Sequence, residues 1–365
     1  MGHSVIIAPD SFKGSVPARE VAAAIARGWA SVRPDDRLTL IPQADGGEGT
    51  LDAIATAVPD AVLHCVGSVT GPDGRPTAGM WLELPGRVGV VELAQSCGLP
   101  LMKGPDPLGA TTRGLGEVIR HALGHGVDSI VIGIGGSAST DGGAGALAAL
   151  GLQLLDEHGA VIPDGGGSLT SLASIRRDAM IAPPPRGATL LTDVSAPLLG
   201  PTGAAAVFGP QKGAATADIR TLDAALARFA SLLGGNPDQP GAGAAGGMAY
   251  GLAAVWGATI ESGAAYLQKL SGLTAAIVTA DVVITGEGRF DDTSSGGKVV
   301  GELLRLAGQH QVAVGIIAGQ VATETEAWTL TLAELAGTAQ KAIADPVPAL
   351  EEAGRRAARH FTERP

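Results

Sequence analysis

The chain has 365 residues, of which 45% are hydrophobic, and its 36 acidic residues outnumber 25 Lys and Arg to give a net charge of −11 at pH 7. The apolar content excludes a disordered chain, and the length indicates roughly two domains. The acidic balance argues against a nucleic-acid partner, because binding to phosphate backbones needs a basic surface.

The first sixty residues alternate between strand and helix patterns. Residues 4–9 predict a strand, and apolar residues at helical spacing in 17–32 predict a helix. RLTLIPQ (37–43) predicts a second strand, which is followed by the polar loop ADGGEGT and another helix. Two successive strand–loop–helix units indicate a parallel, doubly wound sheet.

The pattern changes in the middle of the chain. From His64 to Met102, short β-like runs alternate with turns, which indicates an antiparallel sheet and entry into a second domain. The uncharged run 241–260 is long enough to cross a bilayer, but its glycines and the lack of a basic flank favour a tightly packed internal helix. Strands and helices alternate again from residue 280 to the C-terminus.

These patterns predict an α/β fold with two domains. Residues 1–63 and 265–365 form a discontinuous Rossmann-like domain with a parallel sheet, and residues 64–264 form an inserted mixed α/β domain. The N-terminus lacks the basic start and long apolar core of a signal peptide. Cys65 and Cys97 have no CxxC or zinc-type spacing, so we interpret them as buried, reduced thiols of a cytoplasmic protein.

The charged, glycine-rich loop TGEGRFDDTSSGGK (285–298) follows the apolar strand 281–285. We expect a glycine-rich turn that carries Glu287, Arg289, Asp291 and Asp292, and a following helix that Lys298 opens. Polar groups at the carboxyl end of a parallel strand lie where α/β proteins bind ligands, and a helix start suits a phosphate. Because so many charges are costly to bury unless they serve one another or a ligand, we interpret this loop as a binding site.

Two further loops near the N-terminus carry candidate residues. Asp10, Ser11 and Lys13 follow the first strand, and a helix cap with a surface lysine is an equally good interpretation of that loop alone. The second loop contributes Asp45 and Glu48, and a capping role is the alternative for Asp45.

The loop GIGGSASTDGG supplies glycines, which let backbone N–H groups approach a ligand, and the hydroxyl of Ser137. It also contains G-x-G-x-x-A from Gly133 to Ala138, with Asp156 near the position of a ribose-binding acid, so a dinucleotide site is an alternative. Against it, Gly133 falls inside the strand pattern and the polar loop is longer than that fingerprint needs. Downstream, Asp193 ends a strand and Lys212 lies in a later loop.

The combined residue inventory suits phosphoryl transfer. That chemistry needs cations and N–H groups to spread charge, and carboxylates to hold Mg²⁺ and orient a hydroxyl. The chain has no Ser-His-Asp order and no Walker A motif. Hydride transfer does not need so many lysines and acids.

Six motifs, in this order, resemble the bacterial glycerate kinase type 1 family: APDSFKGS, ADGGEGT, GIGGSASTDGGAG, FGPQKGA, PGAGAAGGM and TGEGRFD..T..GGK. The resemblance covers nearly the whole chain. It implies two α/β domains with the active site in the cleft between them, in a cytoplasmic enzyme. The implied reaction is ATP-dependent, Mg²⁺-assisted phosphorylation of D-glycerate to 2-phosphoglycerate, with 3-phosphoglycerate less favoured. Where the family commonly has D-V-x-N-P-L, this chain has Ala196 in place of the Asn, which puts substrate orientation in doubt.

From the loops and the resemblance we assign roles as hypotheses. Asp193 accepts the proton of the attacking hydroxyl or orients it, and Lys13 and Asp45 act with it in catalysis. The remaining roles are substrate binding by Asp10, Ser11, Ser137, Arg289 and Lys212, nucleotide binding by Gly135, Gly136, Gly286, Gly288 and Lys298, and Mg²⁺ binding by Glu287 and Asp291, with Asp45 as the alternative metal ligand.

Two alternative functions are an NAD-dependent oxidoreductase that uses Gly133–Ala138, and a non-catalytic metabolite-binding regulator. We expect D-glycerate as the small-molecule partner, and neither nucleic acid nor membrane as a partner. The sequence leaves open whether the protein forms a homo-oligomer.

Overall fold

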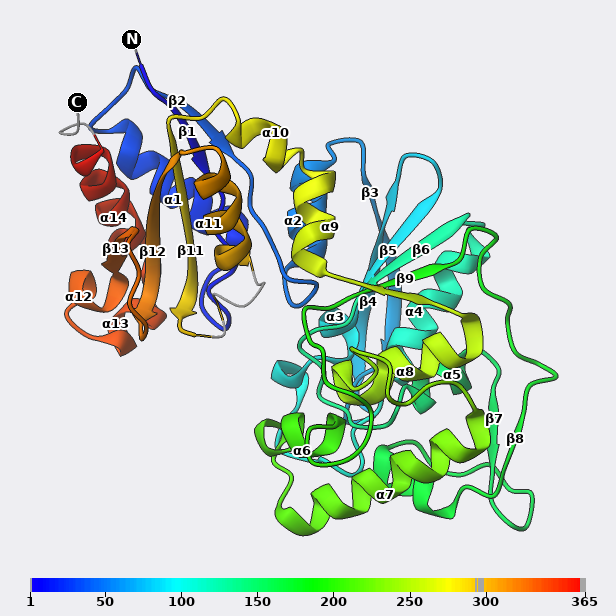
Figure 1. The fold of residues 1–365 in the computed structure, drawn as a ribbon. Helices are drawn as coiled ribbons and strands as arrows, with labels where there is room; N and C mark the ends of the chain where they lie inside the picture. The colour runs from blue at the N-terminus through cyan, green and yellow to red at the C-terminus, as the bar shows by residue number, and fades with distance from the viewer. Residues whose placement is uncertain (1, 293, 295–298, 362–365) are drawn as a thin grey trace. The chain divides into compact units, whose positions relative to one another are not determined.

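The structure is a computed structural model, which describes residues 2–292, 294 and 299–361. The chain divides into two compact units (Figure 1). The first unit contains Met1–Asp45, Asp52–Pro59 and Gly263–Pro365, and the second contains Gly46–Leu51 and Asp60–Ser262. The predicted domains, 1–63 with 265–365 and 64–264, differ from these units at 46–51 and by a few residues at the junctions. Their standing as separate domains stays a prediction.

The first unit is built on a five-stranded parallel sheet with the order β13-β12-β11-β1-β2. Its strands are β1 (Ser4–Ile7), β2 (Arg37–Leu40), β11 (Val282–Phe290), β12 (Ala313–Val321) and β13 (Trp328–Thr331). Counted along the chain within the unit, the order is 2-1-3-4-5, so the winding direction reverses between β1 and β11. Ligands of doubly wound sheets bind at the carboxyl ends of the strands beside such a reversal.

Both faces of this sheet are covered by helices, which explains why β1 and the first half of β11, in the middle of the sheet, are mostly apolar and buried (Figure 1). Successive residues of a strand point to opposite faces. Val5 and Ile7 pack into a core with α1 and α14, whereas Ile6 packs into a separate core with α9, α10 and α11. The helices of the chain ends are α1 (Ala18–Ala30), α2 (Thr50–Ala57), α9 (Gly263–Leu270), α10 (Leu273–Ile277), α11 (Val299–Gln309), α12 (Leu332–Ala336), α13 (Ala339–Ala344) and α14 (Pro346–His360).

Strand β11 is longer than we predicted. We expected the strand to end at Thr285 and a glycine-rich turn to follow, but β11 continues to Phe290, which pairs with Val321 of β12. The prediction was wrong because β12 extends beyond the end of β1 and offers a backbone partner there. Gly286 permits the close approach, since a Cβ atom at that position would clash with the carbonyl oxygen of Ile317.

The second unit contains a six-stranded mixed sheet with the order β10-β9-β6-β5-β4-β3. The pairs β3–β4 and β4–β5 are antiparallel, which confirms the antiparallel pattern predicted for this region, and the remaining pairs are parallel. A separate antiparallel ribbon joins β7 and β8. The strands are β3 (Val62–Thr70), β4 (Pro76–Leu84), β5 (Val88–Glu92), β6 (Ser129–Gly133), β7 (Gln153–Leu155), β8 (Ser174–Arg176), β9 (Ala188–Leu191) and β10 (Thr259–Glu261). The predicted α/β class with parallel sheets is confirmed.

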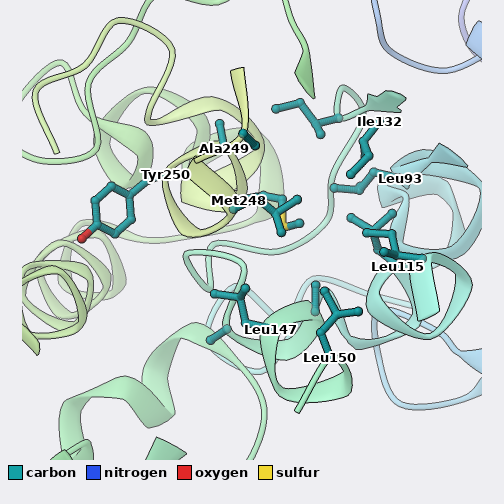
Figure 2. Close-up of a cluster of buried hydrophobic side chains, with 14 of the residues drawn as sticks. Leu93, Leu115, Ile132, Leu147, Leu150, Met248, Ala249 and Tyr250 are labelled. Atoms are coloured by element: carbon teal, nitrogen blue, oxygen red, sulfur yellow. The ribbon is translucent and has the colours of Figure 1, made fainter. Parts of the chain in front are cut away.

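The helices of the second unit enclose a large apolar core, part of which Figure 2 shows. In that view Ile132 of β6 lies beside Leu93 of α3, and Leu115 of α4, Leu147 of α5 and Met248 of α8 belong to the same core. The helices are α3 (Leu93–Cys97), α4 (Arg113–Gly124), α5 (Ala144–Ala149), α6 (Ala204–Phe208), α7 (Thr216–Leu233) and α8 (Ala244–Trp256), with short 3₁₀ turns at Leu99–Leu101, Gly166–Ser171 and Pro210–Lys212.

Part of the Gly/Ala run forms α8, which confirms the predicted internal helix. Ala245, Gly246 and Gly247 have positive φ, so the regular helix begins after them. A Cβ atom at Gly251 would clash with the carbonyl oxygen of Gly142, so glycine is needed for this approach. In the part of the chain that the structure describes, no helix combines the length and apolarity needed to cross a membrane.

The two thiols differ in exposure. Cys97 is buried, and burial raises the pKa of its thiol to about 12. Cys65 is exposed on β3, which corrects the expectation that both cysteines are buried. The expectation failed because β3 is an edge strand with many exposed positions.

Candidate functional site

The first unit contains a pocket of about 420 Å³. It is lined by the segments that follow β1 and β2, by the carboxyl-terminal halves of β11 and β12, and by residues of α12 and α13, and it lies at the reversal of the sheet order. Eight of the residues singled out from the sequence line it: Asp10, Ser11, Lys13, Asp45, Glu287, Gly288, Arg289 and Asp291. Three segments that are far apart in the chain thus contribute these residues to one pocket.

The loop that carries Lys13 is held in a fixed shape by its own backbone. The Asp10 N–H donates to the carbonyl of Gly286 at 2.8 Å, which extends the pairing of β1 with β11. Phe12 and Val16 exchange backbone hydrogen bonds of 2.9 and 3.1 Å around Gly14, which has a φ of +74°. The turn therefore presents the side chains of residues 11 and 13 from a rigid base.

Carboxylates dominate the electrostatics of this pocket. Asp10 is buried, and this burial, together with the neighbouring carboxylate of Asp45, raises the pKa of Asp10 to about 8 although Lys13 opposes the shift. Lys13 Nζ lies 3.3 Å from Asp45 Oδ2, and its side chain is 55% exposed. Asp10 is therefore largely protonated at neutral pH, while Lys13 is accessible to an anionic ligand.

Ser11 provides a hydrogen-bonding group that none of the described residues uses. Its side chain lines the pocket and is only 6% exposed. Its Oγ is buried and has no hydrogen-bond partner among the described residues. A buried hydroxyl of this kind is costly unless a ligand or water satisfies it.

The acids of the pocket outnumber its cations, and this bears on metal binding. Among the described lining residues, Asp45, Glu287 and Asp291 outnumber the cations Lys13 and Arg289, and Asp10 is largely protonated, so an unaccompanied polyphosphate would meet an excess of negative charge. In the described ranges, no three His, Cys, Asp or Glu side chains are grouped to hold an ion. Magnesium in phosphoryl-transfer sites is commonly held by one or two carboxylates and by the phosphates themselves. The donor set fits that mode of binding.

The carboxyl edge of the second unit's sheet gathers a separate group of polar residues. Glu92 ends β5 and is 1% exposed, and it accepts hydrogen bonds from the N–H groups of Gly49 and Leu51 at 3.1 and 2.9 Å. The loop after β6 contains Ser137, and Asp193 follows β9, which pairs in parallel with β6. Parallel neighbours end at the same edge, so the Ser137 loop and Asp193 share it.

Lys212 is the buried cation of this second group. It is 3% exposed, and its Nζ donates to Ser137 Oγ at 2.9 Å and to the carbonyl of Ser139 at 2.5 Å. Burial lowers the pKa of Lys212 to about 7, against the opposing effect of Asp141. The structure therefore brings together two of the residues predicted for the substrate, Lys212 and Ser137.

Asp141 fixes the loop that surrounds Lys212. Its carboxylate is fully buried and accepts four hydrogen bonds: from the N–H and Oγ1 of Thr112 at 2.9 and 2.8 Å, and from the N–H groups of Gly143 and Gly145 at 3.1 and 3.2 Å. Burial raises the pKa of Asp141, and these donors oppose that rise. A carboxylate with so many donors shapes the loop rather than reacting.

The predicted nucleotide-binding glycines have different surroundings. Gly288 lines the first-unit pocket, but Gly286 is buried inside β11 and does not. Gly135 packs against Gly47, because a Cβ atom there would lie 2.5 Å from the Gly47 Cα, and Gly136 has a φ of +77°. Lys298 lies outside the described residues.

Some residues of these sites escaped the sequence analysis. Glu92 carried a usable signal, since it is a charged residue at the end of the apolar run VGVV. The apolar residues that α12 and α13 contribute to the first-unit pocket had no recognisable sequence signal, because a short helix with Ala and Ile resembles an ordinary helix of the hydrophobic core.

The structure argues against the dinucleotide alternative. Gly133 is the last residue of β6, so our objection that it lies within the strand was wrong. Asp156, however, lies in a turn of the β7–β8 ribbon, where its Oδ1 accepts the N–H groups of His158 and Ala160, each at 2.9 Å. A ribose-binding acid would have to end a strand parallel to β6.

A family profile, curated relatives and a solved structure each match most of this chain. The sequence profile of a family described as "Glycerate kinase family" matches residues 5–363. Glycerate 2-kinase of Escherichia coli (strain K12) is 41% identical over 87% of this chain and 85% of its own length. Glycerate kinase of Bacillus subtilis (strain 168) is 41% identical over 88% and 86%. A crystal structure assigned to glycerate kinase 2 of Salmonella typhimurium LT2 aligns with a TM-score of 0.81 and 37% identity, and covers 99% of both chains.

Proposed function

The chain belongs to the glycerate kinase family and is therefore a phosphotransferase that acts on an alcohol group. We propose that it transfers the terminal phosphoryl group of ATP to the 2-hydroxyl of D-glycerate. The single observation that carries this proposal is the first-unit pocket, which combines Lys13, the unsatisfied Ser11 hydroxyl and several carboxylates at the reversal of the sheet order. Positioning and charge stabilisation, which such a site provides, are the main needs of phosphoryl transfer.

In this proposal Lys13 binds the phosphoryl group in transit. Its Nζ donates to an equatorial oxygen, and the ion pair with Asp45 holds the ammonium in place before the ligand arrives. Ser11 donates its hydroxyl to a second oxygen. Protonated Asp10 lines the same pocket and avoids adding another negative charge beside the phosphate.

The alcohol is prepared by residues of the second unit. Lys212, with Ser137, binds the carboxylate of glycerate, and an anion beside Nζ favours the protonated amine. Asp193 accepts the proton of the attacking hydroxyl, or orients that hydroxyl, as its oxygen bonds to the terminal phosphorus and the bond from that phosphorus to the bridging oxygen of ADP breaks.

We propose Glu287 and Asp291 as the residues that hold Mg²⁺, with Asp45 as the alternative ligand. When bound, Mg²⁺ would neutralise phosphate charge and align the polyphosphate. The excess of carboxylates in the pocket supports this assignment.

We propose that the reaction takes place in the cytoplasm, as the family resemblance implies.

Phosphorus NMR of the product tests this proposal. The protein is incubated with ATP, Mg²⁺ and D-glycerate, and the expected product signal is that of 2-phosphoglycerate. Replacement of Ala196 by Asn, the residue that the family commonly has there, is the matched comparison. A 3-phosphoglycerate signal from the wild-type protein would refute the regiochemistry, and the absence of any phosphoglycerate would refute the activity.

A further inference from the structure

The first-unit pocket has an apolar wall that the proposed chemistry does not use. We call the apolar wall the residues Phe12, Leu332, Ala339, Ala342 and Ile343, which line the pocket together with the charged residues. Phe12, Leu332 and Ala342 are nearly buried, whereas Ile343 is 59% exposed. An exposed isoleucine beside a pocket is an apolar surface that a ligand can cover.

We propose that the apolar wall binds the base of the nucleotide that donates the phosphoryl group. This inference rests on the proposed function, and it deepens it by assigning the nucleotide, rather than glycerate, to the first unit. The base lies against Ile343 and Ala339, and the polyphosphate extends toward Lys13.

The apolar wall and the charged residues of the pocket together favour a nucleoside triphosphate as the ligand. A nucleoside triphosphate has a flat, largely apolar base at one end and concentrated charge at the other, which matches a pocket with both an apolar wall and charged residues. Glycerate is a three-carbon acid with oxygen on every carbon, so it has no apolar surface to place on the wall. The pocket volume of about 420 Å³ is within the range typical of sites for ligands much larger than glycerate.

The wall and the phosphate-binding loop are joined by a hydrogen bond. Ser15, two residues after Lys13, donates its Oγ to the carbonyl of Ile343 at 2.7 Å. The start of α13 is fixed in turn, because Thr338 Oγ1 accepts the N–H of Lys341 at 3.2 Å. Such connections hold the base-binding surface at a constant distance from Lys13, and this preorganisation favours one ligand length.

Calorimetric titration of Ile343→Ala tests the proposal. The full-length protein is titrated with MgATP and, separately, with magnesium tripolyphosphate, which has the charge but no base. We expect about tenfold weaker binding of ATP, because apolar contact with the base is lost, and unchanged binding of tripolyphosphate. Val278→Ala is the matched control, since Val278 is also in the first unit, is 57% exposed, and does not line the pocket. It is expected to bind both ligands like the wild-type protein.

The outcomes separate this inference from the proposed function. An ATP affinity that changes less than twofold in Ile343→Ala, or equal weakening for ATP and tripolyphosphate, would overturn the assignment of the wall to the base even if D-glycerate is phosphorylated. Selective loss of ATP affinity in a protein that does not phosphorylate D-glycerate would support the base site and refute the proposed function. Thermal melting of each variant checks that the fold is retained.

Discussion

The pH dependence of stability offers a sharp test of the buried carboxyl group of Asp10. Burial and the neighbouring Asp45 raise the pKa of Asp10 from 3.8 to about 8 in the folded protein. Between these values the folded state keeps a proton that the unfolded state releases. The contribution of Asp10 to stability is therefore fully present below pH 3.8 and is lost as the pH rises toward 8.

The size of the effect follows from this difference in pKa. At pH 7 the pH is about three units above the pKa of the unfolded carboxyl, which is therefore ionised, whereas the folded carboxyl is still mostly protonated. At about 1.4 kcal/mol per unit, this one group lowers the free energy of unfolding by about 4 kcal/mol between pH 4 and pH 7. Asp10→Asn cannot ionise, and its side-chain oxygen can still accept the N–H of Ser11.

Urea denaturation of the wild-type protein and of Asp10→Asn at pH 4.5, 6, 7 and 8 measures this contribution. We expect the two proteins to be similar at pH 4.5 and the variant to become progressively more stable as the pH rises. Asp35→Asn, which removes an exposed carboxylate of the same unit, is the control and is expected to show no such trend. A stability difference that stays constant with pH, or one that favours the wild-type protein at pH 8, would refute the reasoning.

Four other substitutions give direct tests. Lys13→Ala is expected to lower kcat/KM more than tenfold in an ADP-release assay, and a smaller loss would contradict its contact with the phosphoryl group. Asp193→Asn is expected to reduce kcat by orders of magnitude with nearly unchanged ATP binding in calorimetry, and retained turnover would exclude it as the base. Because burial lowers the pKa of Lys212 from 10.5 to about 7, the unfolded state binds more protons in this interval and wild-type stability rises with pH. Lys212→Met is therefore expected to raise the melting temperature most below pH 7, and an equal shift at pH 6 and pH 9 would be inconsistent with that. Gly286→Ala is expected to destabilise the protein by about 3 kcal/mol or more in denaturation, through the clash with Ile317, and wild-type stability would contradict the close packing of β11.

Local patterns were sufficient to predict the α/β class and most of the elements. The apolar runs around Ile6 and Val283 predicted buried strands, and the structure pairs both in one parallel sheet. The charged residues also predicted the polar part of the first-unit pocket, because Lys13 follows β1 and Glu287 lies in the carboxyl-terminal half of β11, and these two strands lie side by side. That rule works since parallel strands present their carboxyl ends at one edge.

The remaining features depend on contacts that no local pattern encodes. The extension of β11 past Thr285 arises from pairing with β12, whose length on that side could not be read from β11 itself. The burial of Lys212 depends on Ser137, which is 75 residues away in the chain. Gly286 was expected to bind the nucleotide, whereas its small size allows the close packing of β11 against Ile317, and a glycine in a sequence is compatible with both roles.

We propose that this protein couples ATP cleavage to the phosphorylation of D-glycerate. The most direct measurement is the initial rate of ADP release with and without D-glycerate, in the presence of MgATP. We expect release that depends on D-glycerate and saturates with its concentration. Release at the same rate without D-glycerate, or no release at all from a protein whose folded state is verified by its melting curve, would contradict the claim.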